Sequence, residues 1–257
     1  MKNKILLFIP VYNCKTQVLR LLKKLENEDL SLIHEVLFID NKSNDGTFEF
    51  LNETLKNSRI DTKLKLFQNE NNYNLGGSHK IALNYSIQNH FHGMIIMHGD
   101  DQTDLKYVTD LLIKQKNKNL LGARFHEMSI LPGYSIFRIF GNRLFNLFFS
   151  LVLQKKVYDI GCGLNYFYLE DFKDRNYLNY PDEILYPVYL NLDILINKKD
   201  YSWFSLKWEE KDQKSNARLF SDTVKLCMLL FNAILKKKFI YKNKKNYKYT
   251  LIYEKKD

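Results

Sequence analysis

The sequence predicts an α/β domain built on a mixed, mostly parallel sheet flanked by helices, and two observations lead to this prediction. In the first half of the chain, short apolar runs alternate with stretches whose apolar residues recur at helical spacing. Such alternation is typical of crossover units, in which a helix connects two parallel strands. In addition, polar residues directly follow the apolar runs, and ligands of such sheets bind beyond the carboxyl ends of the strands.

The predicted elements follow one another in a regular order. Strands are expected at Ile5–Ile9, where Pro10 would stop the strand, and at Glu35–Ile39, Leu64–Phe67 and Met94–Met97. Helices are expected between them, at Thr16–Leu25, Gly46–Leu55 and Ser78–Ile87. The second half is less regular, although Ile136–Leu153 and Thr223–Leu235 are strongly apolar and adjoin basic residues. These two segments are predicted to be helices that either pack in the core or lie in a membrane interface.

Composition and charge narrow the range of partners. The chain has 257 residues, of which 45% are hydrophobic, which suits one large folded domain or two small ones. Lys and Arg exceed Asp and Glu by 39 − 29 = 10, and nine Lys against Glu254 and Asp257 in residues 236–257 supply +7 of that surplus. This basic segment indicates either an anionic partner, such as phospholipid, nucleic acid or a phosphorylated substrate, or a solvated tail.

Cysteine spacing and apolar runs bear on the compartment. The three cysteines, Cys14, Cys162 and Cys227, are far apart and fit neither a metal site nor an even disulfide set, which predicts a reducing compartment. The first apolar run, Ile5–Ile9, is too short for the core of a signal peptide. No run is expected to reach the ~18 to 20 apolar residues of a membrane span.

The segment Met94–Asp104 leads a predicted strand into a cluster of polar groups that includes His98, Asp100, Asp101 and Gln102. Carboxylate and amide oxygens are the ligands that Mg²⁺ and Mn²⁺ prefer. Asp100 and Gln102 lie two residues apart, so in an extended loop both face one ion while Asp101 points away. The alternative interpretation is a turn with solvated acids. For His98, the alternative to a substrate contact is an imidazole that closes the strand through hydrogen bonds.

A second short motif, Gly76-Gly77-Ser78, precedes a predicted helix. A phosphate could bind at the N-terminus of that helix with help from Lys80. The alternative is a glycine turn that feeds the helix. The motif is neither a Walker sequence nor a dinucleotide fingerprint.

Seven segments, in their order and spacing, resemble the motifs of the family 2 glycosyltransferases, which have the GT-A fold. They are IPVYN, VLFIDNKSNDGT, NYNLGGSHKIALNYSI, MHGDDQTD, GAR, DIGCGLN and EEKDQKSNARL. The later motifs resemble those of the dolichol-phosphate mannose synthase branch, which transfers a sugar onto a polyprenyl phosphate. The resemblance covers about residues 4–220 and implies a GT-A domain over residues 1–220, followed by an amphipathic, basic C-terminal extension over residues 221–257.

The resemblance also implies roles for individual residues. Asp100 and Gln102 would bind a Mg²⁺ or Mn²⁺ ion that bridges the donor diphosphate, and Arg124 would meet an acceptor phosphate. The implied nucleotide-sugar-binding residues are Pro10, Tyr12, Asn13, Asp40, Asn41, Lys80, His98, Gly99, Asp100 and Arg218. Three positions depart from the family pattern: His98 stands where Asp is frequent, Cys14 where Glu is common, and Asn165 where the polyprenyl-phosphate branch usually has Arg.

The acceptor decides whether a general base is needed. A phosphate is already ionised at neutral pH, whereas a sugar hydroxyl requires a base, usually a carboxylate. The candidate bases are Asp159 and Asp182, and the predicted catalytic set is Asp100, Arg124 and Asp159.

The predicted function is metal-dependent, inverting transfer of a sugar from a nucleotide-diphosphate sugar to a polyprenyl phosphate. The protein is expected at the cytoplasmic face of the cell membrane as a peripheral protein, with an anionic membrane surface as partner and without a nucleic-acid partner. One alternative is a glycosyltransferase that uses a saccharide acceptor in surface-polysaccharide biosynthesis. Another, of a different class, is a catalytically idle nucleotide-sugar-binding or membrane-scaffold protein.

Overall fold

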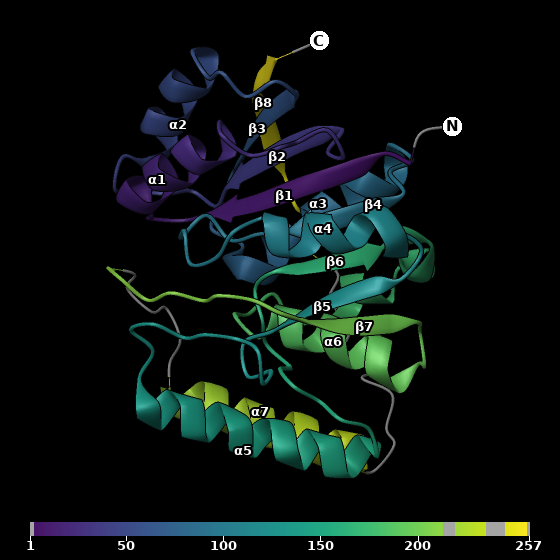
Figure 1. Cartoon of the computed structure of the whole chain (residues 1–257). Coiled ribbons are helices and arrows are strands. Elements are labelled where there is room, and N and C mark those ends of the chain that lie inside the picture. Colours follow the sequence, from purple (N-terminus) through teal and green to yellow (C-terminus); the bar gives the residue numbers. More distant parts are fainter. Residues whose placement is uncertain (1–2, 213–218, 235–244, 256–257) are drawn as a thin grey trace.

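The protein folds around one sheet in a computed structural model that describes residues 3–212, 219–234 and 245–255. In these residues the sheet has eight strands in the order β7-β5-β6-β4-β1-β2-β3-β8 (Figure 1). Their bounds are β1 Ile5–Val11, β2 Glu35–Asp40, β3 Lys63–Asn69, β4 Gly93–Ile96, β5 Asn119–Ala123, β6 Asn165–Tyr168, β7 Tyr201–Ser205 and β8 Tyr249–Lys255. Neighbours around β1 pair in parallel, whereas β6 and β8 are antiparallel to theirs. The predicted mixed, mostly parallel sheet is thus confirmed.

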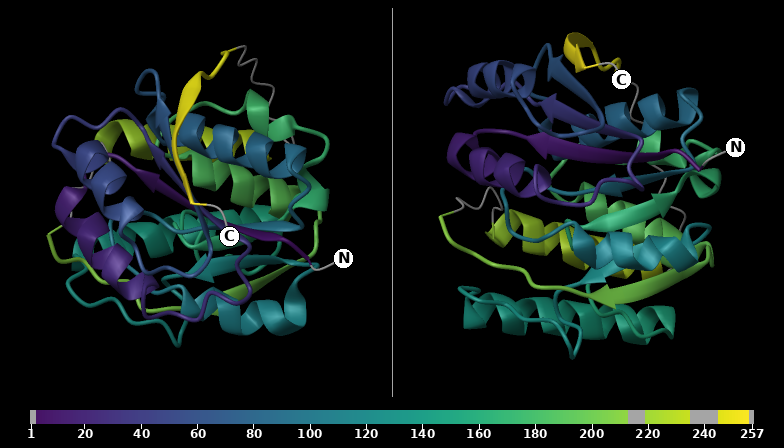
Figure 2. Two further views of the ribbon diagram at one scale, coloured as in Figure 1. Left: turned by 90° about the horizontal axis from the view of Figure 1, so that it is seen from above. Right: turned by 45° about the horizontal axis from the view of Figure 1, so that its top comes forward.

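Helices cover both faces of this sheet (Figure 2). They are α1 Lys15–Leu25, α2 Thr47–Lys56, α3 Asn74–Gln88, α4 Lys106–Gln115, α5 Ile136–Leu153, α6 Tyr186–Ile196 and α7 Leu219–Ile234, with short 3-10 turns η1 Leu169–Phe172 and η2 Asn176–Asn179.

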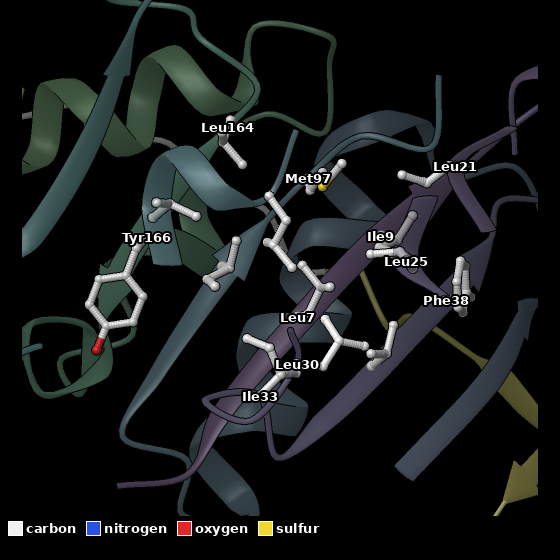
Figure 3. Close-up of a cluster of buried hydrophobic side chains, with 14 of the residues drawn as sticks. Leu7, Ile9, Leu21, Leu25, Leu30, Ile33, Phe38, Met97, Leu164 and Tyr166 are labelled. Carbon is white, nitrogen blue, oxygen red and sulfur yellow. The ribbon is translucent and has the colours of Figure 1, made fainter. Parts of the chain in front are cut away.

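Alternate residues of the central strand β1 point into two separate cores. Leu7 and Ile9 belong to the core beneath α1, α2 and α4, where they share a cluster with Leu21 and Leu25 of α1 (Figure 3). Phe8 belongs to the core beneath α3 and α6. A strand buried on both faces must be apolar at every position, which explains why β1 reads as a continuous apolar run.

Two predicted boundaries were wrong. Strand β1 runs through Pro10 to Val11 instead of stopping at Pro10. Proline lacks an N–H but keeps its carbonyl, and the Pro10 carbonyl accepts a hydrogen bond from Gly99 N at 3.1 Å. Helix α3 begins at Asn74, so Gly76 and Gly77 lie inside its first turns rather than in a turn before it. A Cβ on Gly76 would lie 2.6 Å from the Cα of Asp182, so the close approach of two backbones requires glycine there.

The described part of the predicted C-terminal extension contains most of helix α7 and strand β8. Helix α7 packs against α5, and β8 forms the edge of the sheet by pairing antiparallel with β3 (Figure 1). The chain therefore returns to the sheet after residue 221. The Lys-rich stretch 236–244 lies outside the described residues.

The expectation that no segment reaches the length of a membrane span was also wrong. Among the described residues, α5 has 18 residues and a mean hydropathy of 1.4, which is long and apolar enough to cross a membrane by length and composition.

Candidate active site

The carboxyl ends of four neighbouring strands bring polar groups together at one edge of the sheet. Val11 lies in register with Asp40 on β2, and Asp40 lies in register with Gln68 on β3. The loop after β4 joins them, because Gly99 N donates to the Pro10 carbonyl. A Cβ on Gly99 would lie 2.6 Å from a methyl carbon of Val11, so this approach requires glycine. The predicted convergence of strand ends is therefore present.

The β1–β2–β3 side of this edge is lined by hydrogen-bonding groups. Asp40 is fully buried, and its carboxylate accepts hydrogen bonds from Ser43 N at 3.2 Å and from the Gln68 amide at 3.2 Å. A carboxylate has more acceptor positions than these two bonds use, so Asp40 can accept from a further N–H donor. Tyr12, which follows β1, is half-buried. Sequence reasoning missed Gln68, although its position at a strand end next to Asp40 was a usable signal.

Asn13 and Asn41 hold the loops of this side in place. Asn13 has a φ of 50°, and its side-chain oxygen accepts a hydrogen bond from Asn44 N at 2.9 Å. The Asn41 amide donates to Asn72 at 2.9 Å and accepts from Asn69 and from Tyr73 N, both at 2.9 Å. These bonds are internal to the protein, so Asn41 orders the loop after β2, and its contact with a nucleotide sugar stays a prediction.

The β4 loop turns Asp100 and Gln102 toward each other and Asp101 away. With the Gln102 amide oriented to suit its neighbours, its nitrogen donates to Asp100 Oδ2 at 2.8 Å and its oxygen accepts from Trp208 Nε1 at 3.3 Å. Asp101 has a φ of 59°, and its buried carboxylate pairs with Arg20 at 2.9 Å and Lys24 at 2.7 Å. The two neighbouring carboxylates therefore have different surroundings.

A divalent cation fits at Asp100 by two criteria. The donor at hand is the hard carboxylate oxygen of Asp100, whereas the Gln102 oxygen is turned to Trp208, so metal binding by Gln102 stays a prediction. Burial raises the pKa of Asp100 to about 7, with contributions from the charges of Asp101 and Glu210, so this carboxylate lies where a cation would favour its ionised form. No cluster of three or more His, Cys, Asp or Glu side chains with metal-binding geometry occurs in the described parts of the chain. A small protein ligand set of this kind suits an ion that substrate phosphates and water complete.

Arg124 and Asp159 form a buried, forked ion pair beside this loop. Arg124 Nε donates to Asp159 Oδ2 at 2.7 Å and Nη2 donates to Oδ1 at 3.0 Å, while the Arg124 backbone N–H also donates to Oδ2. Although burial opposes the charge, Asp159 holds the pKa of Arg124 above its usual range. Arg124 Nη1 also donates to the Tyr134 hydroxyl at 3.3 Å. The structure thus joins two of the predicted catalytic residues, and the acceptor contact of Arg124 stays a prediction.

Lys80 is directed to a different place from the one its predicted role requires. Its buried ammonium group donates to Asp182 Oδ1 at 2.7 Å, to Tyr247 Oη at 3.1 Å and to the Tyr180 carbonyl. Burial lowers the pKa of Lys80. Burial opposes the charge of Asp182 as well, but hydrogen bonds from Lys80, Tyr247 and Lys245 hold its pKa below the usual range. This cluster fixes the C-terminal segment on α3.

His98 occupies the floor of the loop. Its ring lies 6.0 Å from the ring of His79, and a Cβ on Gly163 would lie 2.9 Å from it. Burial and the charge of Arg124 lower the pKa of His98 to about 4, so the imidazole is neutral near pH 7. Where the family pattern often has a carboxylate, this chain has an uncharged ring. Arg218, the remaining predicted residue, lies outside the described residues.

A mixed sheet whose parallel strand ends carry a buried acid at β2 and an acid–amide pair after β4 is the arrangement of the GT-A fold. The profile described as glycosyl transferase family 2 matches residues 7–163, and the chain belongs to this family. It is therefore an enzyme of the glycosyltransferase class. The dolichol-phosphate mannose synthase branch is a finer assignment that this match leaves open. A comparison with curated proteins found no match.

Solved structures with the same fold include proteins of low sequence identity to this chain. S. aureus TarS 1–349 in complex with UDP-GlcNAc is 17% identical, with a TM-score of 0.59 over 92% of this chain and 68% of that chain. Glucosyl-3-phosphoglycerate synthase from Mycobacterium tuberculosis, in complex with Mn²⁺, UDP and glucosyl-3-phosphoglycerate, is 10% identical, with a TM-score of 0.59 over 91% and 79%. Mannosyl-3-phosphoglycerate synthase from Rubrobacter xylanophilus is 16% identical, with a TM-score of 0.53 over 91% and 74%. The chain spans about two thirds of the TarS fragment.

Proposed function

We propose that this glycosyltransferase transfers a sugar, with inversion, from a nucleotide-diphosphate sugar to a polyprenyl phosphate at the cytoplasmic face of the cell membrane. Mg²⁺ or Mn²⁺ is the proposed cofactor. The observation that carries the proposal is the state of the two candidate bases, because each of them is bound in an ion pair.

The two candidate bases are unsuited to accept a proton from a hydroxyl acceptor. Both oxygens of Asp159 accept hydrogen bonds from the Arg124 guanidinium. Asp182 is bound to Lys80 and Lys245, and its pKa is held below the usual range. A weakly basic, fully bonded carboxylate is a poor general base. A phosphate acceptor needs no base, since it is already anionic near pH 7, and it therefore suits this site better than a sugar hydroxyl.

The donor side supports a nucleotide sugar with a uracil base. Asp40 offers a carboxylate acceptor and Gln68 an amide beside it, a pair that can bond the N–H and an adjacent carbonyl of uracil. TarS and glucosyl-3-phosphoglycerate synthase, which share the fold, are complexed with UDP-GlcNAc and UDP respectively. A UDP-sugar is therefore the first donor to test, with the GDP-sugar as comparator.

Asp100 would hold the cation, and Gln102 would orient Asp100 through the bond between their side chains. A divalent ion there supplies positive charge to the diphosphate as the leaving oxygen becomes negative. No side chain then has to transfer a proton, because the leaving diphosphate needs no proton and the phosphate acceptor is already ionised.

The test is transfer of radiolabelled sugar from a panel of UDP- and GDP-sugars to undecaprenyl phosphate in detergent with Mn²⁺. The expected result is a chloroform-extractable product that forms with the phosphate and fails to form with the matched alcohol, undecaprenol. Equal use of the alcohol would reject the phosphate argument. Label in a water-soluble saccharide would support the alternative acceptor, and donor binding without turnover of any donor would support the idle binding protein.

A further inference from the structure

The outer face of α5 and α7 carries an exposed apolar surface, here called the α5–α7 face. On α5 it includes Phe137, Phe140, Leu147 and Leu151, which are 90%, 70%, 53% and 66% exposed. On α7 it includes Met228 and Phe231, which are 61% and 59% exposed. The two helices lie side by side, away from the sheet (Figure 1). Large apolar side chains exposed together on two neighbouring helices are a candidate interaction site.

The exposed residues of α5 follow one stripe of the helix. Phe137, Phe140, Leu144, Leu147 and Leu151 succeed each other at alternating spacings of three and four residues. Residues at such spacings share a face. The opposite face of α5 is occupied by residues that bond to the domain, so the exposure is one-sided.

Those bonds run along the whole of α5. Near its first turn, Arg138 pairs with Glu210 at 2.5 Å. In its middle, Asn146 donates to the Tyr158 carbonyl at 2.8 Å and accepts from Ile160 N at 3.1 Å. Near its end, Ser150 accepts from Val157 N at 2.9 Å. A helix held to the domain at both ends and in the middle cannot be surrounded by lipid, so it does not cross a bilayer in this fold even though its length of ~27 Å would allow it.

The charged residues in and just after α5 indicate which kind of partner surface suits the α5–α7 face. Residues 136–156 contain Arg138, Arg143, Lys155 and Lys156 and no Asp or Glu. Arg143 and Lys156 are exposed. Lys156 pairs with the exposed Glu127 at 3.1 Å and Arg138 pairs with Glu210, so Arg143 is the cation of this segment that carries the charge argument. An apolar stripe with a cationic border is typical of helices that lie in the interface of an anionic membrane, with the apolar side chains among the acyl chains and the cations at the phosphates.

We infer that the α5–α7 face docks on an anionic lipid bilayer, with α5 lying in the membrane plane. The inference rests on the proposed function in one respect, because a membrane-embedded acceptor gives the docking a purpose. The contacts also connect this face to the site: Tyr134, just before α5, accepts hydrogen bonds from Arg124 at 3.3 Å and from Arg138 at 3.4 Å. Docking through α5 would therefore bring the membrane surface close to the Arg124 end of the site.

The test is flotation of the full chain with vesicles of phosphatidylcholine, with and without 30% phosphatidylglycerol. The wild type should bind the anionic vesicles, and binding should weaken but persist at 0.5 M salt, since the apolar part is not screened. The double variant Phe137→Glu/Phe140→Glu should reduce the partition coefficient at least tenfold. The matched control is Ile113→Glu, because Ile113 on α4 is 68% exposed but lies apart from this face.

Donor binding measured by calorimetry shows whether each variant is folded and separates the two proposals. Vesicle binding without a lipid product would reject the polyprenyl phosphate acceptor and leave the docking surface standing. Three results would overturn the docking. In the first, the wild type stays with the soluble fraction, and in the second, the control variant loses as much binding as the double variant. In the third, light scattering shows a wild-type dimer that dissociates in the double variant. The last would make the face an interface between two copies.

Discussion

Replacing Asp100 by Asn should stabilise the metal-free protein at alkaline pH and abolish its response to Mn²⁺. Burial raises the pKa of Asp100 from 3.8 to about 7. A carboxyl whose pKa is higher in the folded state contributes stability that is fully present below pH 3.8 and lost as pH rises through 7. The wild type therefore loses stability above pH 4 because of this group, and Asn, which cannot ionise, does not.

The size of the effect follows from the two pKa values. With pKa values of 3.8 unfolded and about 7 folded, linkage gives a loss of about 2 kcal/mol between pH 5.5 and pH 8, at about 1.4 kcal/mol per pKa unit. Mn²⁺ is expected to bind the ionised carboxylate and should then restore stability to the wild type by mass action.

The assay is urea unfolding at pH 5.5 and pH 8 in EDTA, and at pH 8 with 1 mM Mn²⁺. The measured quantity is the difference between wild type and Asp100→Asn, which removes the contributions of other titrating groups. Asp101→Asn is the control, because Asp101 pairs with Arg20 and Lys24 and should leave the Mn²⁺ response intact. The same pH dependence in wild type and Asp100→Asn, or stabilisation of both by Mn²⁺, would refute the assignment of Asp100 as the cation ligand.

Three further predictions test the other groups. Arg124→Lys should raise the KM of the acceptor more than that of the donor, because Lys lacks the forked donor geometry; equal effects in steady-state kinetics would make Arg124 structural. Asp182→Asn should lower the free energy of unfolding by about 3–5 kcal/mol, since it removes the carboxylate of a buried ion pair with Lys80; kcat should change less than about threefold, and a hundredfold loss would identify Asp182 as the base. Gly76→Ala should cost about 1–3 kcal/mol in urea unfolding, since its Cβ would lie 2.6 Å from the Cα of Asp182, and an unchanged midpoint would contradict the close packing.

The sequence was sufficient for the features that depend on local pattern. The continuous apolar runs of β1 and β2 and the helical spacing in α1 identify elements because burial on a sheet and on a helix face imposes periods that can be read directly. The polar groups at Asp40 and Asp100 were found for the same reason, since each follows a recognisable strand. The match to the family then confirmed the class of enzyme.

What the sequence did not reveal are pairings between distant residues. Arg124 and Asp159 are 35 residues apart, and Lys80 and Asp182 are 102 apart, so no local period connects them. Strand β8 was hidden for a related reason. Its residues Tyr249–Lys255 lie in a Lys-rich segment whose composition suggests a solvated tail. The strand is held by pairing with β3 and by packing of Ile252 and Tyr253 against the core.

Acidic side chains of two kinds lie at this site: Asp159 and Asp182, which are bound in ion pairs, and Asp100, whose pKa is raised by burial. Asp159 and Asp182 each have a cation from the protein, and such a pair is costly to form but still more costly to leave half made. Both carboxylates are therefore held in one orientation. Asp100 differs, because burial raises its pKa to about 7 and its charge depends on what binds beside it. In the proposed reaction, a cation arrives with the donor and an ionised phosphate attacks. Such a reaction uses Asp100 and leaves the ion pairs of Asp159 and Asp182 in place. A chemistry in which Asp159 or Asp182 takes a proton from a hydroxyl would first have to break one of the fixed pairs.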